Sequence, residues 1–359
     1  MTIDVRYMRH ALALAERGLG TTAPNPSVGC VIVSSEGQVL GRGWTQPGGR
    51  PHAETIALDA AGPAARGATA YVSLEPCAHH GLTGPCAQAL IDAGISRVVS
   101  ACDDPDPRVG GRGHAMLRAA GIELRTGALR AEAEELNAGF LKRTRTGLPL
   151  VTLKIASSLD GRTALANGES QWITGPEARA AGHLLRATHD AILTGIGTVL
   201  ADDPQLDCRL PGMSDRSPLR IVADRRGRLP HHARLLQNPP SGKVLHLTAA
   251  QNGAAANAER AIVAEDPSGL SVAAMLREAG ARGITRLLVE AGPALTTSFL
   301  KAKVVDRLVW FRSPKLLGGD ARDAIGELTL EVLAFAPRFR RVASTQWGED
   351  VMETYAAET

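Results

Sequence analysis

Residues 51–54 read PHAE, and residues 75–86 read EPCAHHGLTGPC. These two stretches contain His52, Cys77 and Cys86, one imidazole and two thiols, with eight residues between the cysteines. A catalytic zinc site has three protein ligands of these kinds and keeps a fourth position for water, whose pKa the metal lowers towards neutrality. The pattern therefore predicts a zinc site in the first half of the chain.

Glu54 follows the predicted ligand His52 by two positions, at the expected start of a helix. A carboxylate close to the metal but not needed as a ligand can take a proton from the water and deliver it to a ring nitrogen, then to leaving ammonia. The order H-x-E followed by P-C-x-x-C is typical of zinc nucleobase deaminases. We therefore predict hydrolytic deamination, with Glu54 as the catalytic residue.

The spacing of the cysteines departs from that signature, because eight residues stand where it has two. The insert, residues 78–85, must form a loop over the site, which weighs against a plain cytidine or tRNA-adenosine deaminase. A closed zinc site without chemistry, with His79 or His80 as its fourth ligand, is the alternative. A closed structural site does not require a carboxylate at the position of Glu54, so the presence of Glu54 favours a catalytic zinc site.

The composition is that of an ordinary globular protein and excludes several classes of partner. A chain of 359 residues is expected to form two domains. The net charge, 40 − 37 = +3, is too small to indicate nucleic-acid binding, and 3% aromatic residues do not provide a base-stacking surface. We expect no nucleic-acid partner, although a few well-placed arginines can still bind a phosphate.

The five cysteines are odd in number and too few for a disulfide scaffold in so long a chain. Charged residues interrupt residues 1–18, so we expect no signal peptide there. No apolar run is long enough to span a membrane. We expect a cytoplasmic protein, in which clustered Cys and His are metal ligands or reactive thiols rather than bridges.

Apolar runs that suit buried strands alternate with helical patterns along the chain, which predicts α/β layers. The polar, turn-rich stretch TRTGLP at residues 144–149 interrupts this alternation. We place one α/β domain over residues 1–146 and a second over residues 147–359. Within the first we expect a long amphipathic helix over residues 128–143.

The second domain lacks the G-x-G-x-x-G sequence of a standard dinucleotide site. It does contain two places where an apolar strand ends and a helix begins among small residues, at residues 195–198 and 290–296. Free backbone N–H groups at helix N-termini bind phosphate. These places are therefore candidate contacts for a phosphorylated cofactor or substrate.

The segment TAPNPSVG at residues 22–29, the His52/Glu54 pair and the spacing of Cys77 and Cys86 resemble the deaminase half of the bifunctional riboflavin-biosynthesis deaminase/reductase family. The resemblance covers essentially the whole chain. It implies a cytidine-deaminase-like three-layer domain that holds one zinc ion. The implied reaction is hydrolytic deamination of 2,5-diamino-6-(5-phosphoribosylamino)pyrimidin-4(3H)-one.

By this resemblance, Asn25 would hydrogen-bond the pyrimidine, although a turn-forming role is the alternative. From the residues alone, one of His79 and His80 would contact the substrate and the other would face solvent, and we take His79 for the contact. The chain departs from the family pattern at Leu82, where Lys or Arg is usual, at Gly84, where Pro is usual, and at Asp106, where Asn is usual. None of these three positions is a predicted zinc ligand. We therefore expect any effect to fall on substrate affinity.

Four strings in the second half resemble the reductase half of the same family: KIASSLDGR at 154–162, GESQWIT at 168–174, TGIGTVLADDP at 194–204 and VEAGP at 289–293. That half is similar to dihydrofolate reductase in fold. The resemblance implies NADPH-dependent reduction of the ribosyl group to ribityl, without flavin or metal, giving 5-amino-6-(5-phosphoribitylamino)uracil. Direct hydride transfer needs the nicotinamide set against the sugar carbon and water excluded, but no nucleophile.

The resemblance also implies residue roles in the reductase half. The substrate contacts are Ser170, Arg186, Leu206, Arg209 and Glu290. The NADPH contacts are Ala156, Trp172, Thr198, Asp202, Gly292, Pro293, Ala294, Leu295, Thr296, Thr297 and Ser298. Arg186 or Arg209 would clamp the 5′-phosphate in bidentate fashion, and Lys154 either orients the substrate or pairs with a carboxylate. From charge and placement after an apolar strand, we add Arg225, with Arg226 as the alternative, for the 2′-phosphate of NADPH.

The sequence leaves three hypotheses open. The first is a bifunctional enzyme that deaminates the ring in one domain and reduces the sugar in the other. The second is an enzyme of narrower scope, with an inactive reductase half or a different nucleotide as substrate. The third is a zinc-containing scaffold without catalysis, which leaves Glu54 unexplained. We favour the first, and the resemblance further implies a homo-oligomer, a dimer or higher.

Overall fold

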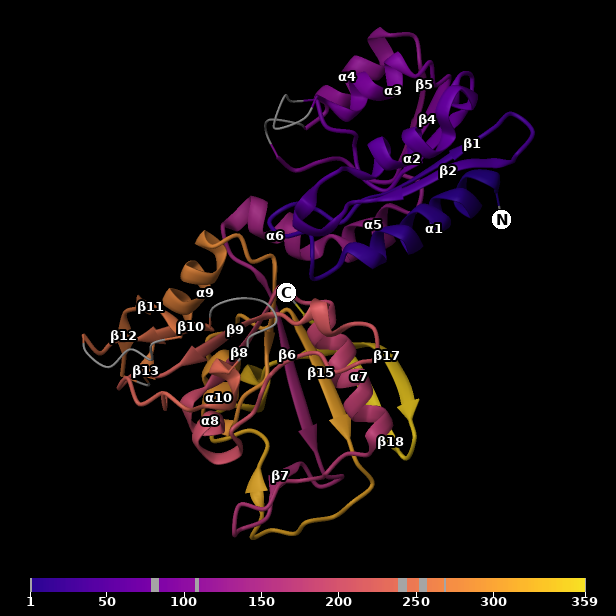
Figure 1. The fold of residues 1–359 in the computed structure, drawn as a ribbon. Helices are drawn as coiled ribbons and strands as arrows, with labels where there is room; N and C mark the ends of the chain where they lie inside the picture. The colour runs from indigo at the N-terminus through magenta and orange to yellow at the C-terminus, as the bar shows by residue number, and fades with distance from the viewer. Residues whose placement is uncertain are drawn as a thin grey trace. The chain divides into compact units, whose positions relative to one another are not determined.

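The computed structural model describes residues 2–78, 84–106, 110–237, 244–251, 257–267 and 269–358. The chain divides into two compact units, Met1–Gly147 and Leu148–Thr359 (Figure 1). Three positions singled out in the sequence, His79, His80 and Leu82, lie outside the described residues. Within the described ranges, no helix is long and apolar enough to cross a membrane.

The N-terminal unit is built on a five-stranded sheet in the order β2-β1-β3-β4-β5. Its strands are β1 Gly29–Val33, β2 Val39–Trp44, β3 Thr69–Val72, β4 Arg97–Ser100 and β5 Glu123–Thr126. β1 is antiparallel to β2 and β3, whereas β3, β4 and β5 run parallel. Every residue of β1 is buried, as the continuous apolar run GCVIV requires of a strand covered on both faces.

Helices cover both faces of this sheet and make the unit a three-layer structure (Figure 1). They are α1 Ile3–Ala15, α2 Ala53–Ala61, α3 Cys86–Asp92, α4 Arg112–Ala119, α5 Arg130–Leu136 and α6 Ala138–Thr146. α1 packs against α5 on one face, while α2, α3 and α4 contact one another in succession on the other. The apolar faces of both helix layers meet β1, β3 and β4 in one continuous core.

The single helix predicted over residues 128–143 is wrong, because the structure has two helices, α5 and α6, that meet at Asn137. Asn137 is buried, and its Oδ1 accepts a hydrogen bond from the Ser27 backbone N at 3.0 Å while its Nδ2 donates to the Ser27 backbone O at 3.0 Å. These two bonds tie the junction to a segment 110 residues away. Helical periodicity is a local pattern, so it cannot indicate a hydrogen-bond partner as distant in the sequence as Ser27.

Glycines in β2 let α2 lie close against the sheet. A Cβ atom on Gly41 would stand 2.0 Å from the backbone O of Ala57, and one on Gly43 would stand 2.1 Å from the backbone O of Ala53. Real Cβ atoms do not approach so closely, so only glycine permits this contact. The contact at Ala53 places the beginning of α2, and with it His52 and Glu54, directly over the strand.

The C-terminal unit is built on a nine-stranded sheet in the order β11-β10-β9-β8-β14-β6-β15-β18-β17. These strands are β6 Leu150–Ser157, β8 Ala191–Gly195, β9 Leu219–Ala223, β10 Val244–Thr248, β11 Ala258–Ile262, β14 Arg286–Val289, β15 Arg307–Arg312, β17 Phe339–Trp347 and β18 Asp350–Ala357. β15 and β18 pair antiparallel, as do β18 and β17, and the remaining neighbours run parallel.

The helices of this unit include α7 Pro176–Ala187, α8 Ile196–Asp202, α9 Val272–Ala281 and α10 Pro293–Lys301. Two short strand pairs complete it, β7 Arg162–Ala164 with β16 Arg322–Asp323 and β12 Glu265–Asp266 with β13 Gly269–Leu270. β8 leads directly into α8, and β14 leads into α10. Both predicted strand-to-helix junctions are therefore present, at the edge where the parallel strands end and where ligands bind in open α/β sheets.

Candidate active sites

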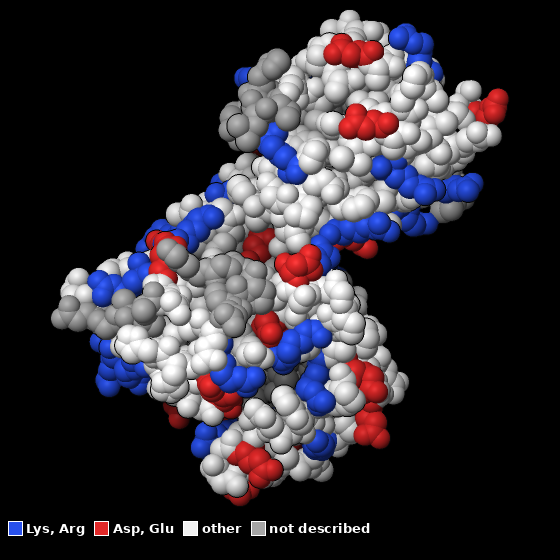
Figure 2. All heavy atoms as spheres, in the orientation of Figure 1, with Lys and Arg blue, Asp and Glu red and all other residues white. Residues whose placement is uncertain are grey.

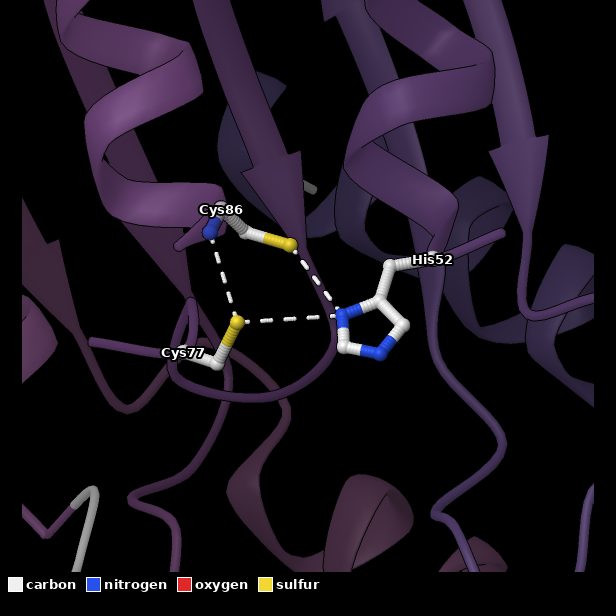
Figure 3. A group of neighbouring side chains, drawn as sticks. All are labelled: His52, Cys77 and Cys86. Carbon is white, nitrogen blue, oxygen red and sulfur yellow. Dashed lines mark hydrogen bonds between the residues drawn. The ribbon is translucent and has the colours of Figure 1, made fainter. Parts of the chain in front are cut away.

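His52, Cys77 and Cys86 come from three separate elements of the N-terminal unit and meet at one point (Figure 3). His52 is the N-cap residue of α2, and Cys86 is the first residue of α3. Cys77 lies in the segment that follows β3. The predicted triad is therefore assembled by two helix starts and one loop.

The distances within the triad fit a tetrahedral zinc ion. The Nδ1 atom of His52 lies 3.2 Å from the Sγ of Cys86 and 3.7 Å from the Sγ of Cys77, and all three donor atoms lie within 4.8 Å of one another. Zinc bonds of about 2.0–2.3 Å in a tetrahedron separate nitrogen from sulfur by about 3.6 Å. One imidazole and two thiols at this separation form a donor set that suits zinc and leaves a fourth position.

The two thiols of the triad differ in acidity. Cys77 accepts hydrogen bonds from the Cys86 thiol, from His52 and from the Cys86 backbone N at 3.3 Å, and these lower the pKa of Cys77 to about 4. The pKa of Cys86 is raised, because its thiol donates to Cys77 and is buried. One thiolate is thus already stable in this pocket, which favours binding of a cation.

Glu54 is buried in the first turn of α2, with 4% of its surface exposed. Burial raises the pKa of Glu54 to about 6, the negative charge on Cys77 acts in the same direction, and His52 opposes it. A carboxyl group with a pKa near neutrality both accepts and returns protons easily. The position and the pKa therefore suit the proton-transfer role predicted from the sequence.

Asn25, the predicted pyrimidine contact, packs against the segment that leads to His52. Its Nδ2 donates to the backbone O of Gly49 at 3.2 Å. A Cβ on Gly49, whose φ is +84°, would stand 2.0 Å from the same Nδ2, so only glycine fits there. Asn25 is half-buried, and it connects its own segment to the segment before α2.

Glu75 is a functional candidate to which the sequence reasoning gave no role. Its buried carboxylate accepts backbone N–H bonds from Asp104 at 3.4 Å, Gly111 at 3.0 Å and His114 at 3.2 Å. These bonds fasten the start of α4 to the residue two positions before Cys77. The sequence could have drawn attention to Glu75, because it stands next to Pro76 and two residues before the predicted ligand Cys77. Its hydrogen-bond partners, however, are known only from the fold.

The C-terminal unit contains a cavity of about 1600 Å³ at the carboxyl ends of β6, β8, β9 and β14. Figure 2 shows a hollow in this unit with Lys and Arg side chains on its rim. The predicted residues that line the cavity are Lys154, Ala156, Ser170, Trp172, Arg186, Thr198, Asp202, Leu206, Arg209, Arg225, Glu290, Gly292, Pro293, Ala294, Leu295, Thr296 and Ser298. Residues far apart in the sequence are thus brought into one space.

Thr297 is the predicted contact that the structure does not place among the lining residues of this cavity. Its hydroxyl donates to the backbone O of Pro293 at 2.7 Å and accepts from the backbone N of Gly326 at 2.8 Å. His183 and Arg179 on α7, to which the sequence reasoning gave no role, do line the cavity. In the sequence, a single Arg and a single His in a helical pattern offered no signal that distinguishes them from solvated side chains.

A buried charge cluster occupies one wall of the cavity. Glu290 pairs with Arg186, whose Nη2 lies 2.7 Å from Oε2, and with Lys154, whose Nζ lies 3.8 Å from Oε1. Burial acts to raise the pKa of Glu290, but the charges of Arg186 and Lys154 outweigh it and hold this pKa at about 2. Of the two roles left open for Lys154, the pairing with a carboxylate is therefore present, on a residue that also lines the cavity.

Two other arginines predicted to bind phosphates, Arg209 and Arg225, lie nearer to solvent than Arg186. Arg209 pairs with Asp207 at 2.7 Å, and Arg225 pairs with Glu265 at 2.7 Å, with about half of each arginine side chain exposed. Exposed pairs of this kind contribute little to stability and exchange partners easily. Both guanidinium groups are therefore available to an incoming phosphate.

Two family models match the chain. Residues 1–102 match the cytidine and deoxycytidylate deaminase zinc-binding region, and residues 149–352 match the RibD C-terminal domain. The first match covers His52, Glu54, Cys77 and Cys86, and the second covers the whole lining of the cavity. These matches confirm the predicted fold class, a cytidine-deaminase-like domain followed by a dihydrofolate-reductase-like domain.

Relatives of known name match nearly the full length of the chain. The riboflavin biosynthesis protein RibD of Escherichia coli is 46% identical, over 97% of this chain and 98% of its own length. The RibD structure from Acinetobacter baumannii superposes with a TM-score of 0.91 at 41% identity, over 99% of both chains. A deaminase/reductase from Thermotoga maritima superposes with a TM-score of 0.89 at 34% identity, also over 99% of both chains.

Sequence identity, fold and the donor set agree, and they confirm the hypothesis of two activities in one polypeptide. Zinc and NADPH are the cofactors of these activities. The chain belongs to the family of bifunctional riboflavin biosynthesis proteins, as a hydrolase that deaminates a phosphorylated pyrimidine and an oxidoreductase that reduces its sugar.

Proposed function

We propose that residues 1–146 deaminate 2,5-diamino-6-(5-phosphoribosylamino)pyrimidin-4(3H)-one and that residues 147–359 reduce the ribosyl group of the product to ribityl. The convergence of His52, Cys77 and Cys86 beside the buried Glu54 is the observation that carries the first half of this proposal. The cavity at the ends of the parallel strands carries the second half.

In the deaminase, His52, Cys77 and Cys86 would hold the zinc ion through one nitrogen and two sulfur atoms. Bound zinc supplies an acidified water as the nucleophile. Glu54 would accept one proton of that water and deliver it to the ring nitrogen, and would then pass the second proton, from the newly added hydroxyl group, to the departing ammonia. Its pKa of about 6 supports this role, because the group then changes protonation state with little free-energy cost at neutral pH. Asn25 and His79 would hold the substrate.

In the reductase, we assign the substrate to the wall of the cavity that carries Lys154, Arg186 and Glu290, together with Ser170, Leu206 and Arg209. Glu290, ionised and fixed by two cations, is an acceptor for sugar hydroxyl groups. Its hydrogen bonds would orient the sugar carbon towards the nicotinamide, which raises the rate by positioning alone. NADPH would lie along Ala156, Trp172, Thr198, Asp202 and the backbone of residues 292–298.

Arg225 is our candidate for the 2′-phosphate of NADPH. It follows β9, lines the cavity and pairs with the half-exposed Glu265. A doubly charged phosphate competes well with a single exposed carboxylate for a guanidinium group. Arg226, the alternative from the sequence, is not among the described residues that line the cavity, which favours Arg225.

We propose that the protein is a homo-oligomer, a dimer or higher, and that a second copy covers β17. β17 is an edge strand, and its residues 340–346 are exposed on both faces. Leu333, 88% exposed, and Phe335, 66% exposed, lie shortly before it in the chain. Unpaired edges and large exposed apolar side chains mark surfaces that associate. Light scattering on the intact protein tests this proposal, and a monomer at micromolar concentration would contradict it.

We also propose a cytoplasmic location. None of the five cysteines forms a disulfide. Two of them, Cys77 and Cys86, must remain reduced to serve as zinc ligands. Fractionation of cells that express the protein tests this location.

A coupled assay on the pyrimidine substrate tests the proposed function. Ammonia release should require zinc and no NADPH, and loss of absorbance at the NADPH band should require the deaminated product. Removing zinc with a chelator and restoring it should abolish and recover the first signal, and the second should persist on product supplied directly. Metal-free protein with full ammonia release would contradict the proposal.

A further inference from the structure

Trp172 is an exposed aromatic residue held in a defined position at the cavity. Its side chain is 59% exposed, and it lines the cavity from the segment between β7 and α7. A large ring with this exposure is ordinarily free to move among rotamers. Two cations from other elements hold this residue in place, one at the ring and one at the backbone.

The first cation is Arg179 on α7. Its Cζ lies 4.6 Å from the centroid of the Trp172 ring, which is a cation–π contact. Its Nη1 also donates to the backbone O of Thr174 at 2.7 Å. Arg179 is half-buried. One guanidinium group therefore fixes both the ring and the backbone two residues further along.

The second cation is Lys315, whose Nζ donates to the backbone O of Trp172 at 2.6 Å. The segment around Lys315 is itself anchored at both of its sides. The backbone N of Leu159 donates to the Lys315 backbone O at 2.7 Å, and the backbone N of Gly318 donates to Oδ2 of Asp160 at 2.8 Å. Lys315 thus approaches Trp172 from a backbone that is already fixed.

We infer that Arg179 and Lys315 are positioning residues that hold Trp172 in the orientation in which it contacts NADPH. The inference rests on the proposed assignment of the cavity to the cofactor. Ordering the ring before the cofactor arrives removes part of the entropic cost of binding. Both cations act through Trp172, on cofactor affinity rather than on the hydride transfer itself.

The first experiment measures NADPH binding by Arg179→Ala and Lys315→Ala in the full-length zinc-containing protein. We expect each substitution to raise the dissociation constant for NADPH about tenfold and to leave kcat for reduction at saturating NADPH within about twofold. Arg179→Lys should recover part of the loss, because it keeps a cation over the ring. Unchanged NADPH affinity in both alanine variants would overturn the inference.

The second experiment separates positioning from direct contact, since Arg179 also lines the cavity. A double-mutant cycle combines Arg179→Ala with Trp172→Ala. If Arg179 acts through the ring, the double variant binds NADPH as weakly as Trp172→Ala alone. If the two losses multiply, Arg179 contacts the cofactor itself and the inference is wrong. The same cycle with Lys315→Ala provides an independent result.

Fluorescence of Trp172 supplies a readout that needs no cofactor. Subtracting the signal of Trp172→Phe isolates this residue from the other three tryptophans. Acrylamide quenching of Trp172 should increase in Arg179→Ala and Lys315→Ala, and equal quenching in variant and parent would contradict the inference. Arg277→Ala, an exposed arginine on α9, is the matched control. If the parent protein does not bind NADPH, the proposed function fails, whereas the quenching result still decides whether the cations hold the ring.

Discussion

Arg186 and Glu290 form a two-point ion pair inside the reductase cavity, with Nη2 2.7 Å from Oε2 and Nε 3.3 Å from Oε1. Only 15% of the Arg186 side chain and 10% of the Glu290 side chain are exposed. The sequence left Arg186 and Arg209 as equal candidates for the 5′-phosphate clamp. Arg209 also pairs with a carboxylate, Asp207, but 49% of its side chain is exposed, whereas Arg186 is mostly buried in its pair with Glu290. This difference in exposure favours Arg209 for the phosphate.

Arg209→Ala should therefore weaken the phosphorylated substrate of the reductase by about 2 kcal/mol, which is a rise of about thirtyfold in KM. The reason is the loss of a charge-assisted contact to the 5′-phosphate. Steady-state reduction with phosphorylated and dephosphorylated substrates measures the effect. Only the phosphorylated substrate should respond, and an equal KM for parent and variant would remove Arg209 from the site.

Glu54→Gln should retain zinc and lose ammonia release by a factor of about a hundred or more, because the amide cannot carry the proton between water and leaving group. NADPH oxidation on substrate that is already deaminated should be unchanged. Measuring both signals on one preparation makes the reductase an internal control for folding. Equal loss of the two activities would contradict separate sites.

Cys77→Ala should bring the zinc content close to zero, because it removes the thiol that is most acidic in the triad. Elemental analysis of the purified protein gives the metal-to-protein ratio. Cys102→Ala is the matched control, since Cys102 is a buried thiol whose pKa is raised by burial. Full retention of zinc by Cys77→Ala would mean that the ligands are misassigned.

Asp4→Asn should destabilise the deaminase unit by about 2 kcal/mol at pH 7. The substitution removes a buried carboxylate and weakens the charge-assisted hydrogen bonds that it accepts. Asp4 accepts two bonds from Arg97 at 2.9 Å, one from Arg125 at 2.6 Å and one from Tyr71 at 3.0 Å. The Arg97 bonds outweigh burial and lower the pKa of Asp4 below its ordinary value of 3.8.

The sign of the pH dependence follows from that lowered pKa. The folded protein binds the Asp4 proton less readily than the unfolded chain, so the carboxylate stabilises the fold above about pH 4 and loses this effect as the pH falls further. Denaturant unfolding at pH 7, 5 and 3 gives the free energy of unfolding of the parent and of Asp4→Asn. The difference between these two free energies should shrink as the pH falls below about 4. Glu123→Gln is the control, because Glu123 pairs with the same Arg97 but is 69% exposed.

The helix break at Asn137 illustrates the limit of local patterns. Residues 128–143 have the spacing of one amphipathic helix, and no local pattern within them predicts that one helix ends and another begins. The break depends on two hydrogen bonds to Ser27. By contrast, the starts of α8 and α10 could be predicted, because a strand that ends in small residues before a helix is a local signal.

The sequence by itself determined the chemistry of the deaminase. Imidazole, thiol and carboxylate groups carry their reactivity in their residue type, so His52, Cys77, Cys86 and Glu54 could be proposed as metal ligands and proton carrier before any fold was known. Only the tertiary structure decided which charges neutralise each other, as in the pairing of Arg186 with Glu290, 104 residues apart. The physical reason is that such a pair depends on distance and burial in the folded chain, which no local pattern of residues records.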